Sequence, residues 1–372
     1  MPLKFYLVAG EKSGDLHGGN LIQSIKALHP DAEFRGFGGE QMEAAGMHVA
    51  VHYNQMAFMG IVQVVLNIRK ILGWMKICKR DLQAFQPDAL VLIDYGGFNM
   101  RLAKYAHANG YRVYYYIAPK VWAWNTGRAW KLKSTVDRMF CILPFEPEFF
   151  KQFNWHVDYV GNPVVDAVQK FIPDPDFANR HDLKNRPVVA LLPGSRRGEL
   201  ARILPLLAEV SSQFPHVDFV VAAIRELPQE LYQPLHNKAN VKFIFDATYD
   251  LLCNARAAIV TSGTATLETA LFNVPQVVVY KASAFEYAIG SRVIKVDFIS
   301  LVNLIAGYAV VQELLQNDAT QAHVSSELNR LLHDENRRQN VFAGYQQIND
   351  KLRVGSASDN TARLMVEDLK QL

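Results

Sequence analysis

The sequence predicts an α/β protein of two Rossmann-like domains, each built on a parallel sheet, and three observations support this fold class. The first is a set of continuous apolar runs that alternate with helical stretches, at 4–10, 89–95, 111–118, 138–145, 187–194, 217–224, 241–247, 257–263 and 275–281. Continuous runs are typical of strands that helices cover on both faces. The second is a stretch rich in proline and charge, 166–187, that separates two sets of runs. The third is that each set opens with a strand, a glycine turn and a helix, at 7–15 and 191–199. Two domains facing across a cleft are the simplest arrangement that satisfies all three.

Length and composition suit this arrangement, since 372 residues, 50% of them hydrophobic, can fill two cores. We expect a first domain over 1–165, a linker over 166–187 and a second domain over 188–335. The remaining residues, 336–372, have a helical pattern and are expected to pack back on the body or on a partner. A linker between two such domains predicts hinge closure.

Charge and cysteine content exclude several classes of protein. Lysine and arginine number 39 against 36 acidic residues, so no overall field favours nucleic acid. The cysteines Cys78, Cys141 and Cys253 lie too far apart for a zinc motif or a disulfide framework and indicate a reducing compartment. Residues 1–10 do not have the pattern of a signal peptide, which predicts a cytosolic protein.

No cofactor or catalytic metal is expected. A metal-dependent transferase would need an Asp-x-Asp pair at the end of a strand. The pair formed by Asp174 and Asp176 surrounds a proline in the predicted linker.

The most hydrophobic segment, residues 56–76, is interrupted by polar and basic residues and falls short of the about 20 apolar residues that a membrane span requires. Its apolar residues recur at helical spacing, and basic residues cluster at its C-terminal end. Two interpretations stay open: a core helix with a solvated basic tip, or a helix at the surface of an anionic membrane. In the second, the membrane contacts are Phe58, Met59, Val62, Val65, Leu66, Arg69, Lys70 and Trp74.

Two turns in the second domain have the pattern of anion sites. Residues 191–199 place Gly194, Ser195 and Arg196 between a buried strand and a helix, where backbone amides converge. Arg196 can add a charge-assisted contact to a diphosphate. The alternative is an ordinary strand-to-helix turn with surface arginines.

Residues 261–270 repeat this pattern with Ser262, Gly263 and Thr264, and two anion sites in one domain fit one diphosphate. Glu268 follows about one turn into the helix, where a carboxylate can accept ribose hydroxyls. The alternative is that Thr264 caps the helix and Glu268 only complements the helix dipole.

Acidic residues follow the first strand of the first domain, within 9–19. A carboxylate beside a substrate hydroxyl can act as a general base, and we expect Asp15 in that role with Glu11 orienting the substrate. His17 ranks below Asp15 as a base. The alternative is that Ser13 or Asp15 caps the following helix.

Two more strand ends of the first domain carry polar or aromatic residues. Asp94 and Asn99 should reach the same sheet edge, with Asp94 orienting the substrate. The next strand is followed by Lys120, Trp122 and Trp124, where aromatic rings beside cations suit an acylated, phosphorylated ligand. Two tryptophans in a loop are nevertheless more often packing residues.

Together these elements resemble one family, the lipid-A-disaccharide synthases of Gram-negative bacteria, two-domain transferases of the GT-B type. The motifs occur in the family's order and cover nearly the whole chain: AGEKSGDLHG, MGIVQVV, ID-x-x-x-FN, VWAW, LPFE, VGNP, LLPGSR, SGTATLE and ISLVNLIAG.

The resemblance implies an inverting transfer of sugar from UDP-2,3-diacylglucosamine to the 6-hydroxyl of 2,3-diacylglucosamine 1-phosphate, which gives a β-1,6-linked disaccharide and UDP. It implies a peripheral position on the cytoplasmic face of the inner membrane, and a homodimer stays open. UDP would lie at the two turns of the second domain. The acceptor or its acyl chains would contact Asn99, Lys120, Trp122, Trp124 and Asn303.

The chain departs from the family pattern at two positions. Gly97 stands where many members have a second aspartate, so the catalytic role of that carboxylate cannot be carried over. Asn162 replaces a histidine that often precedes Pro163. Two rival functions stay open: another GT-B enzyme or an epimerase acting on soluble UDP-N-acetylglucosamine, and, prompted by Gly97, a catalytically silent protein that binds a sugar nucleotide or lipid. Substrate acylation and turnover distinguish them.

Overall fold

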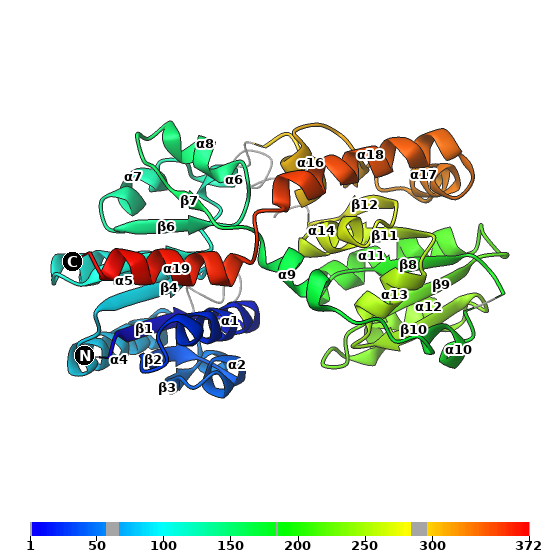
Figure 1. Cartoon of the computed structure of the whole chain (residues 1–372). Coiled ribbons are helices and arrows are strands. Elements are labelled where there is room, and N and C mark those ends of the chain that lie inside the picture. Colours follow the sequence, from blue (N-terminus) through cyan, green and yellow to red (C-terminus); the bar gives the residue numbers. More distant parts are fainter. Residues whose placement is uncertain (1, 57–66, 184, 284–295, 372) are drawn as a thin grey trace. The chain divides into compact units, whose positions relative to one another are not determined.

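The computed structural model describes residues 2–56, 67–183, 185–283 and 296–371 (Figure 1). The chain forms two compact units. The first unit comprises Met1–Pro163 and Val354–Leu372, and the second comprises Val164–Arg353. Each unit is built on a parallel sheet flanked by helices, so the predicted fold class is confirmed.

The first sheet has the strand order β3-β2-β1-β4-β5-β6-β7, with all neighbours parallel. Its strands are β1 (Lys4–Ala9), β2 (Glu33–Gly38), β3 (His48–His52), β4 (Ala89–Ile93), β5 (Arg112–Tyr116), β6 (Arg138–Cys141) and β7 (Asp158–Tyr159). The order reverses between β1 and β4, where Ala9 pairs with Ile93. Open α/β sheets bind ligands at the carboxyl ends of the strands beside such a switch point.

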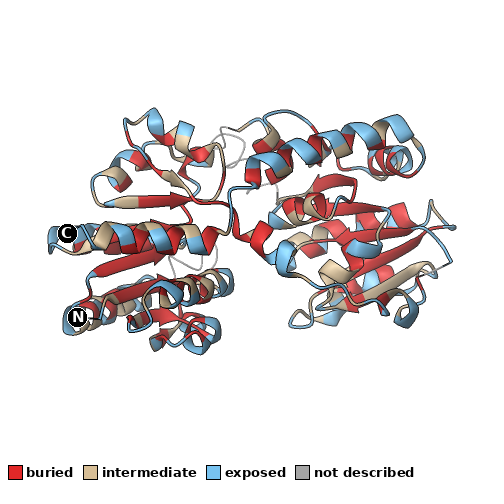
Figure 2. Ribbon diagram, viewed as in Figure 1, coloured by how far each residue is buried: buried red, intermediate tan, exposed pale blue. Residues whose placement is uncertain are grey.

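Helices cover both faces of this sheet, and each face has its own apolar core (Figure 2). On one face, Met75, Cys78 and Leu82 of α4 pack with apolar residues of α5, α7 and α8. On the other, α1 packs with α19 and α2. The helices of the unit are α1 (Lys12–Leu28), α2 (Glu40–Ala44), α4 (Ile68–Phe85), α5 (Gly96–Ala108), α6 (Val121–Trp124), α7 (Arg128–Lys133), α8 (Glu146–Lys151) and α19 (Ala357–Leu369), with the 3-10 turn η1 (Tyr53–Gln55).

The second sheet has the strand order β10-β9-β8-β11-β12-β13, again all parallel, with its switch point between β8 and β11. The strands are β8 (Val188–Leu192), β9 (Asp218–Ala223), β10 (Val241–Phe245), β11 (Ala257–Thr261), β12 (Gln276–Tyr280) and β13 (Gln312–Leu315). The helices are α10 (Phe177–Arg180), α11 (Arg197–Ser211), α12 (Gln233–His236), α13 (Thr248–Asn254), α14 (Thr264–Leu271), α16 (Leu301–Ala306), α17 (Gln321–His333) and α18 (Glu335–Leu352), with the 3-10 turn η2 (Gln229–Tyr232).

The stretch expected to be a linker, 166–187, differs from that expectation. It contains most of α9 (Pro163–Lys170) and all of α10. Phe177 and Leu183 are buried in the core of the second unit. The few apolar residues of this stretch are enough to hold it on the second unit, because the core of that unit supplies their packing partners.

The C-terminal helices divide between the units. α18 belongs to the second unit, whereas α19 belongs to the first. The guanidinium of Arg112 and the hydroxyl of Tyr114, both on β5, bind the carboxylate of Asp368. The backbone after β7 packs tightly against the turn before α19, since a Cβ on Gly161 would lie 2.8 Å from the carbonyl oxygen of Gly355.

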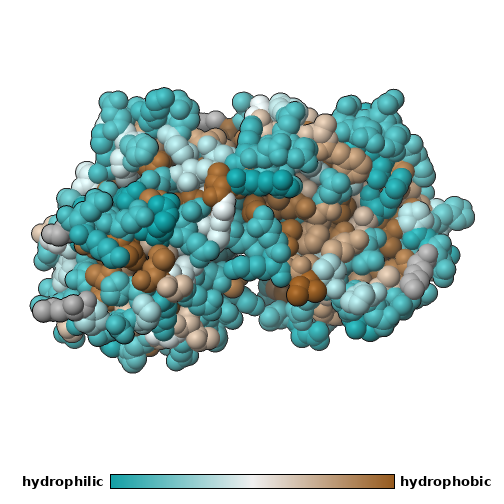
Figure 3. Space-filling view, viewed as in Figure 1, coloured by the Kyte–Doolittle hydropathy of each residue, from teal (hydrophilic) through white to brown (hydrophobic). Residues whose placement is uncertain are grey.

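Among the described helices, none is both long enough and apolar enough to cross a membrane. On the face shown in Figure 3, hydrophilic residues predominate, with apolar patches between them.

Candidate active site

A pocket of about 310 Å³ lies at the switch point of the first sheet. It brings together Glu11, which follows β1, and Asp94, which follows β4. The remaining lining residues are Ile68, Ile71, Tyr95, Gly96, Gly97, Phe98 and Arg101. The pocket therefore combines two carboxylates, a guanidinium and an apolar wall from α4, which suits a ligand with both hydroxyls and apolar groups.

The backbone around Asp94 is held in a strained form. Asp94 and Tyr95 both adopt left-handed φ values, 46° and 47°, which non-glycine residues visit rarely. The hydroxyl of Tyr115 and the amide of Asn99 donate to the Asp94 carbonyl oxygen, at 2.6 and 2.9 Å. Gly10 permits the turn, because a Cβ there would lie 2.4 Å from the Tyr95 ring. Such strain is typical of functional sites.

The pocket changes the ionisation of Asp94. Burial among protein atoms raises the pKa of Asp94, while the positive charge of Lys120 opposes that rise. The Asp94 side chain nevertheless has a solvent-exposed side, so water limits the effect. A carboxyl with a raised pKa and access to the pocket has the properties of a general base.

The prediction that Asp15 is the base requires correction. Asp15 is 1% exposed. Its carboxylate accepts hydrogen bonds from the backbone amides of Gly39, Gln41 and Met42 at 2.7 to 3.2 Å. It therefore caps the N-terminus of α2 and does not line the pocket.

Burial lowers the pKa of His17, the second candidate for the base, to about 4, so its imidazole is neutral at physiological pH.

We expect Asp15→Asn to lower the free energy of unfolding by about 1–3 kcal/mol, because the new amide group cannot accept from all three backbone donors. The turnover number of the folded variant should change little. Denaturant unfolding and steady-state kinetics would check this. Loss of turnover at unchanged stability would return Asp15 to a catalytic role.

Asn99 also requires correction, since it is fully buried and does not line the pocket. Its amide nitrogen donates to the carbonyl oxygens of Val8, Ile93 and Asp94. Asn99 therefore joins the ends of β1 and β4 and shapes the pocket without being positioned to contact an acceptor.

The predicted acceptor contacts in the turn after β5 differ in exposure. Trp122 is buried, and its indole nitrogen donates to Glu146 at 3.1 Å, so it is a packing residue. Trp124 is exposed, with the guanidinium of Arg128 4.3 Å from its ring centre. Lys120 is exposed and lies close enough to Asp94 to influence its pKa.

Within the described residues, α4 packs on the core along one side and exposes the rest of its surface. Its inner side, which includes Met75 and Trp74, packs on the core, so Trp74 is not simply a surface anchor. Away from the core the helix exposes Leu72 and Ile77 beside basic residues, while the partly exposed Ile68 lines the pocket. The exposed basic residues are Arg69, Lys70, Lys76 and Arg80. The predicted contacts Phe58, Met59, Val62, Val65 and Leu66 lie outside the described residues.

The switch point of the second sheet brings the two glycine turns together. Gly194 has a φ of 96°, and a Cβ there would lie 3.6 Å from the Thr261 methyl group. The Thr261 hydroxyl is buried and has no hydrogen-bond partner among the described residues. A buried hydroxyl without a partner at this edge is suited to a ligand oxygen.

Two helices begin at this switch point, α11 after Arg196 and α14 after Gly263. Neither has a side-chain cap among the described residues, so Thr264 is not a cap. The first amides of a helix have no partner within it and attract anions. Ser195 is exposed, and Arg196 is 68% exposed and paired with Glu199 at 3.2 Å. Both turns can therefore hold phosphate.

Two further predicted residues have defined partners. The hydroxyl of Tyr249 donates to Glu268 at 2.9 Å, and burial raises the pKa of Glu268. Ser262 donates to the carbonyl oxygen of Ile299 at 2.9 Å. Glu268 is only partly buried and keeps a carboxylate near the start of α14.

Asn303 requires correction as an acceptor contact. Its amide nitrogen donates to Val311 and Glu313, and its amide oxygen accepts from the backbone amides of Val310 and Val311. It is 1% exposed. These bonds use its polar atoms to hold the segment before β13 within the second unit.

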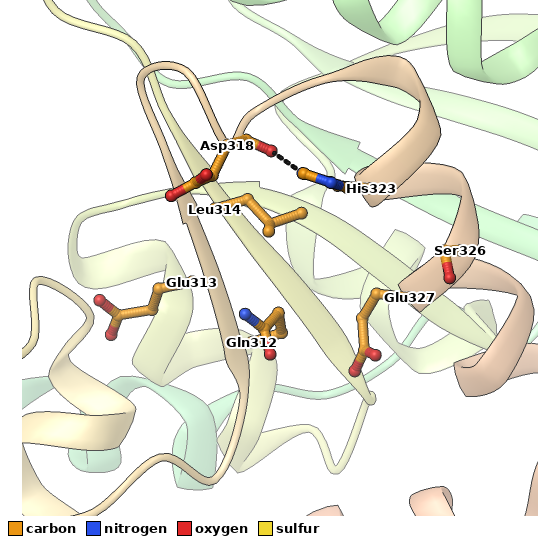
Figure 4. A pocket seen from close by; sticks show the side chains of 7 residues that line it. All are labelled: Gln312, Glu313, Leu314, Asp318, His323, Ser326 and Glu327. Atoms are coloured by element: carbon orange, nitrogen blue, oxygen red, sulfur yellow. Dashed lines mark hydrogen bonds between the residues drawn. The ribbon is translucent and has the colours of Figure 1, made fainter.

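Another pocket, of about 340 Å³, lies beside β13 and α17 (Figure 4). Two of its side chains have partners in the same unit: Glu327 pairs with Arg330 and Arg337, and His323 contacts the Asp318 carbonyl oxygen. β13 is an edge strand, so this pocket does not lie at the switch point. Across the described ranges, no group of at least three histidine, cysteine or acidic residues could hold a metal ion.

Some pocket residues were not predicted from the sequence. Tyr95 stands within the Asp94 element and could have been included from that position. Arg101 and Ile71 reach the pocket from α5 and α4, and only the packing of those helices reveals it. Tyr249 carries no local signal of its contact with Glu268.

Two Rossmann-like domains, each with a polar site at its switch point, define a protein of the GT-B fold class. Solved structures share this fold. A glycosyltransferase of kitacinnamycin has a TM-score of 0.70 and 13% identity, with 99% of this chain and 100% of that chain covered. The UDP-GlcNAc 2-epimerase from Neisseria meningitidis, bound to UDP-GlcNAc, has a TM-score of 0.67 and 14% identity, with 100% of both chains covered.

The chain belongs to the lipid-A-disaccharide synthetase family, whose model matches residues 5–366. The lipid-A-disaccharide synthase of Geobacter metallireducens is 38% identical over 370 residues, which cover 98% of this chain and 96% of the relative. The resemblance to this family is thus confirmed, and the chain is a glycosyltransferase of lipid A disaccharide synthesis.

Proposed function

We propose that the chain transfers 2,3-diacylglucosamine from UDP to the 6-hydroxyl of 2,3-diacylglucosamine 1-phosphate, with inversion. The observation that carries this proposal is the pairing of a phosphate-type site in one unit with an acidic, partly apolar pocket in the other, in a chain of this family. The products are the β-1,6-linked disaccharide 1-phosphate and UDP.

In this proposal the second unit binds the donor. The diphosphate lies against the amides that follow Gly194 and Gly263, with Arg196 as the cation. These donors stabilise the negative charge that grows on the diphosphate as the glycosidic bond breaks. Glu268 accepts hydrogen bonds from the ribose. The solved epimerase with UDP-GlcNAc shows that this fold accommodates a UDP-sugar.

The first unit binds the acceptor, and Asp94 replaces Asp15 as the proposed base. Its carboxylate takes the proton of the 6-hydroxyl as the oxygen bonds to the anomeric carbon and UDP leaves. Glu11 orients the sugar through its hydroxyls. Ile68 and Ile71 supply the apolar wall, and Lys120 supplies a positive charge for the acceptor phosphate.

The first experiment is UDP release from the purified full chain in detergent, with the acylated donor and acceptor and with UDP-N-acetylglucosamine as a control. Release confined to the acylated pair, with formation of the disaccharide, would support the proposal. Turnover of the control alone would indicate a soluble substrate. Binding of UDP without turnover of either would indicate a silent binding protein.

We further propose that α4 contacts the cytoplasmic face of the inner membrane through its outer side. Leu72 and Ile77 are 50% and 43% exposed, and basic residues flank them. Apolar side chains can enter the interface while lysine and arginine bind anionic headgroups. Both lipid substrates would be held at that surface.

We expect the double substitution Leu72→Ser and Ile77→Ser to weaken binding to phosphatidylglycerol vesicles about 10- to 30-fold, because two apolar side chains no longer enter the interface. Vesicle sedimentation would measure this. Ile172→Ser is the matched control, since Ile172 is an exposed apolar residue of the second unit. Equal loss in the control, or none in the double variant, would contradict the assignment.

A further inference from the structure

Glu146, the first residue of α8, is a buried carboxylate that has no assigned role in the proposed transfer. It is 1% exposed. One carboxylate oxygen accepts from the backbone amides of Ile142 and Leu143, at 3.2 and 2.9 Å, and the other accepts from the Trp122 indole at 3.1 Å. Glu146 therefore ties the turn after β6 to α6, which follows β5. Asn162 also binds this turn, by donating to the Ile142 carbonyl oxygen.

The segment that leads into α6 lies against the acceptor pocket. A Cβ on Gly96, which lines the pocket, would lie 3.3 Å from the Pro119 side chain. Lys120 comes next, at the N-cap of α6. The segment begins with Ile117, whose φ is 65°. A β-branched residue in the left-handed region is strained, so contacts must hold the segment in this form.

Lys120 lies near both acids of this region, the exposed Asp94 and the buried Glu146. Its charge lowers the pKa of Asp94 and of Glu146, opposing the effect of burial on each. Burial is the larger effect at Glu146 and raises its pKa to about 7. The other titratable groups that face Glu146 are Cys141 on β6 and Tyr159 on β7, whose pKa values rise further because of the carboxylate.

We propose that Glu146 is a positioning residue of the acceptor pocket, whose carboxylate holds α6 through Trp122 and thereby holds Lys120 beside Asp94. This inference rests on the proposed function, in which Asp94 is the base and Lys120 faces the acceptor phosphate. When Glu146 is ionised, both of its oxygens accept hydrogen bonds. When it is protonated, one oxygen becomes a donor, and the link to either the β6 turn or Trp122 weakens.

The main test is the steady-state kinetics of Glu146→Gln in the full chain. We expect kcat/KM for the acceptor to fall about 10- to 100-fold, since small misplacements of a site have effects of that size, while the donor KM stays unchanged. We also expect the wild-type rate to rise with pH through an ionisation near 7 that the variant lacks. An equal loss toward donor and acceptor, or an unaltered pH profile, would overturn the inference.

Trp122→Phe keeps an aromatic ring but removes the indole donor. It should reproduce the acceptor defect to a smaller extent, and the double variant should be no worse than Glu146→Gln, because both changes break one link. Additive losses would contradict a shared role. Tyr114→Phe is the structural control: Tyr114 lies on β5, the strand that leads to α6, and the change removes its partly buried hydrogen bond to Asp368 of α19. It should lower the melting temperature without a selective acceptor defect.

A readout without transfer separates failure of this inference from failure of the proposed function. In ¹⁵N-tryptophan-labelled protein, the indole signal that Trp122→Phe removes should shift with a midpoint near pH 7, and Glu146→Gln should abolish that shift. A signal that does not respond to pH would overturn the link between Glu146 and Trp122. If the signal titrates as expected but wild-type protein makes no disaccharide, the proposed function fails and the link stands.

Discussion

Asp94→Asn is expected to lower kcat for disaccharide formation about 10²- to 10⁴-fold, the usual contribution of a general base. Asparagine keeps the size of the side chain but cannot take the acceptor proton. The backbone should keep its form, because the Asp94 carbonyl oxygen is held by Tyr115 and Asn99 and not by its own side chain. Single-turnover rates with saturating donor and acceptor would measure the loss.

Two variants sharpen this test. Glu11→Gln should raise the acceptor KM more than it lowers kcat, since Glu11 orients the sugar in the proposal. Gly97→Asp should fold normally, because a Cβ at Gly97 would meet nothing within 4 Å and an aspartate suits the first turn of α5. In the Asp94→Asn background, Gly97→Asp should recover part of the lost rate. A normal rate for Asp94→Asn alone would disprove its role as the base.

Arg196→Ala is expected to lower kcat about 10²- to 10³-fold, which is the usual result of removing one donor to developing charge. The Arg196 side chain is 68% exposed. Within the described residues, its guanidinium forms an ion pair with Glu199. It can therefore turn to a diphosphate at the start of α11 without disrupting the core. UDP affinity by calorimetry and steady-state kinetics would together measure the effect.

Arg180→Ala serves as the matched control for Arg196→Ala. Arg180 is also an exposed arginine of the second unit, paired with Asp174, but it lies on α10 and not at the switch point. Its removal should leave UDP affinity and turnover within about twofold, as for an exposed ion pair of little energy. Equal losses from both substitutions would show a general effect of charge and not a specific contact with the diphosphate.

Local sequence signals were sufficient for nine of the described strands, the two glycine turns and the resemblance to the family, but they missed β2, β3, β7 and β13. Continuous apolar runs predict buried parallel strands because helices cover both faces of such a sheet. The turn at Gly194 could be predicted locally, because a φ of 96° favours glycine whatever the tertiary contacts of the turn are. The order of motifs along the chain carried the family assignment without any tertiary contact.

The tertiary structure alone decided which polar residues are structural. Asp15, Asn99, Asn303 and Trp122 look like ligand contacts from their positions after strands or in motifs, yet each is buried with partners inside its own unit. A buried polar group must be hydrogen-bonded, but its sequence position does not name the partner. For Asp15 the partners are backbone amides at 39–42, which only the packing of α2 against α1 brings near. The same reason explains Asp94: its raised pKa and its place in a pocket arise from neighbours on other elements, and no local pattern contains them.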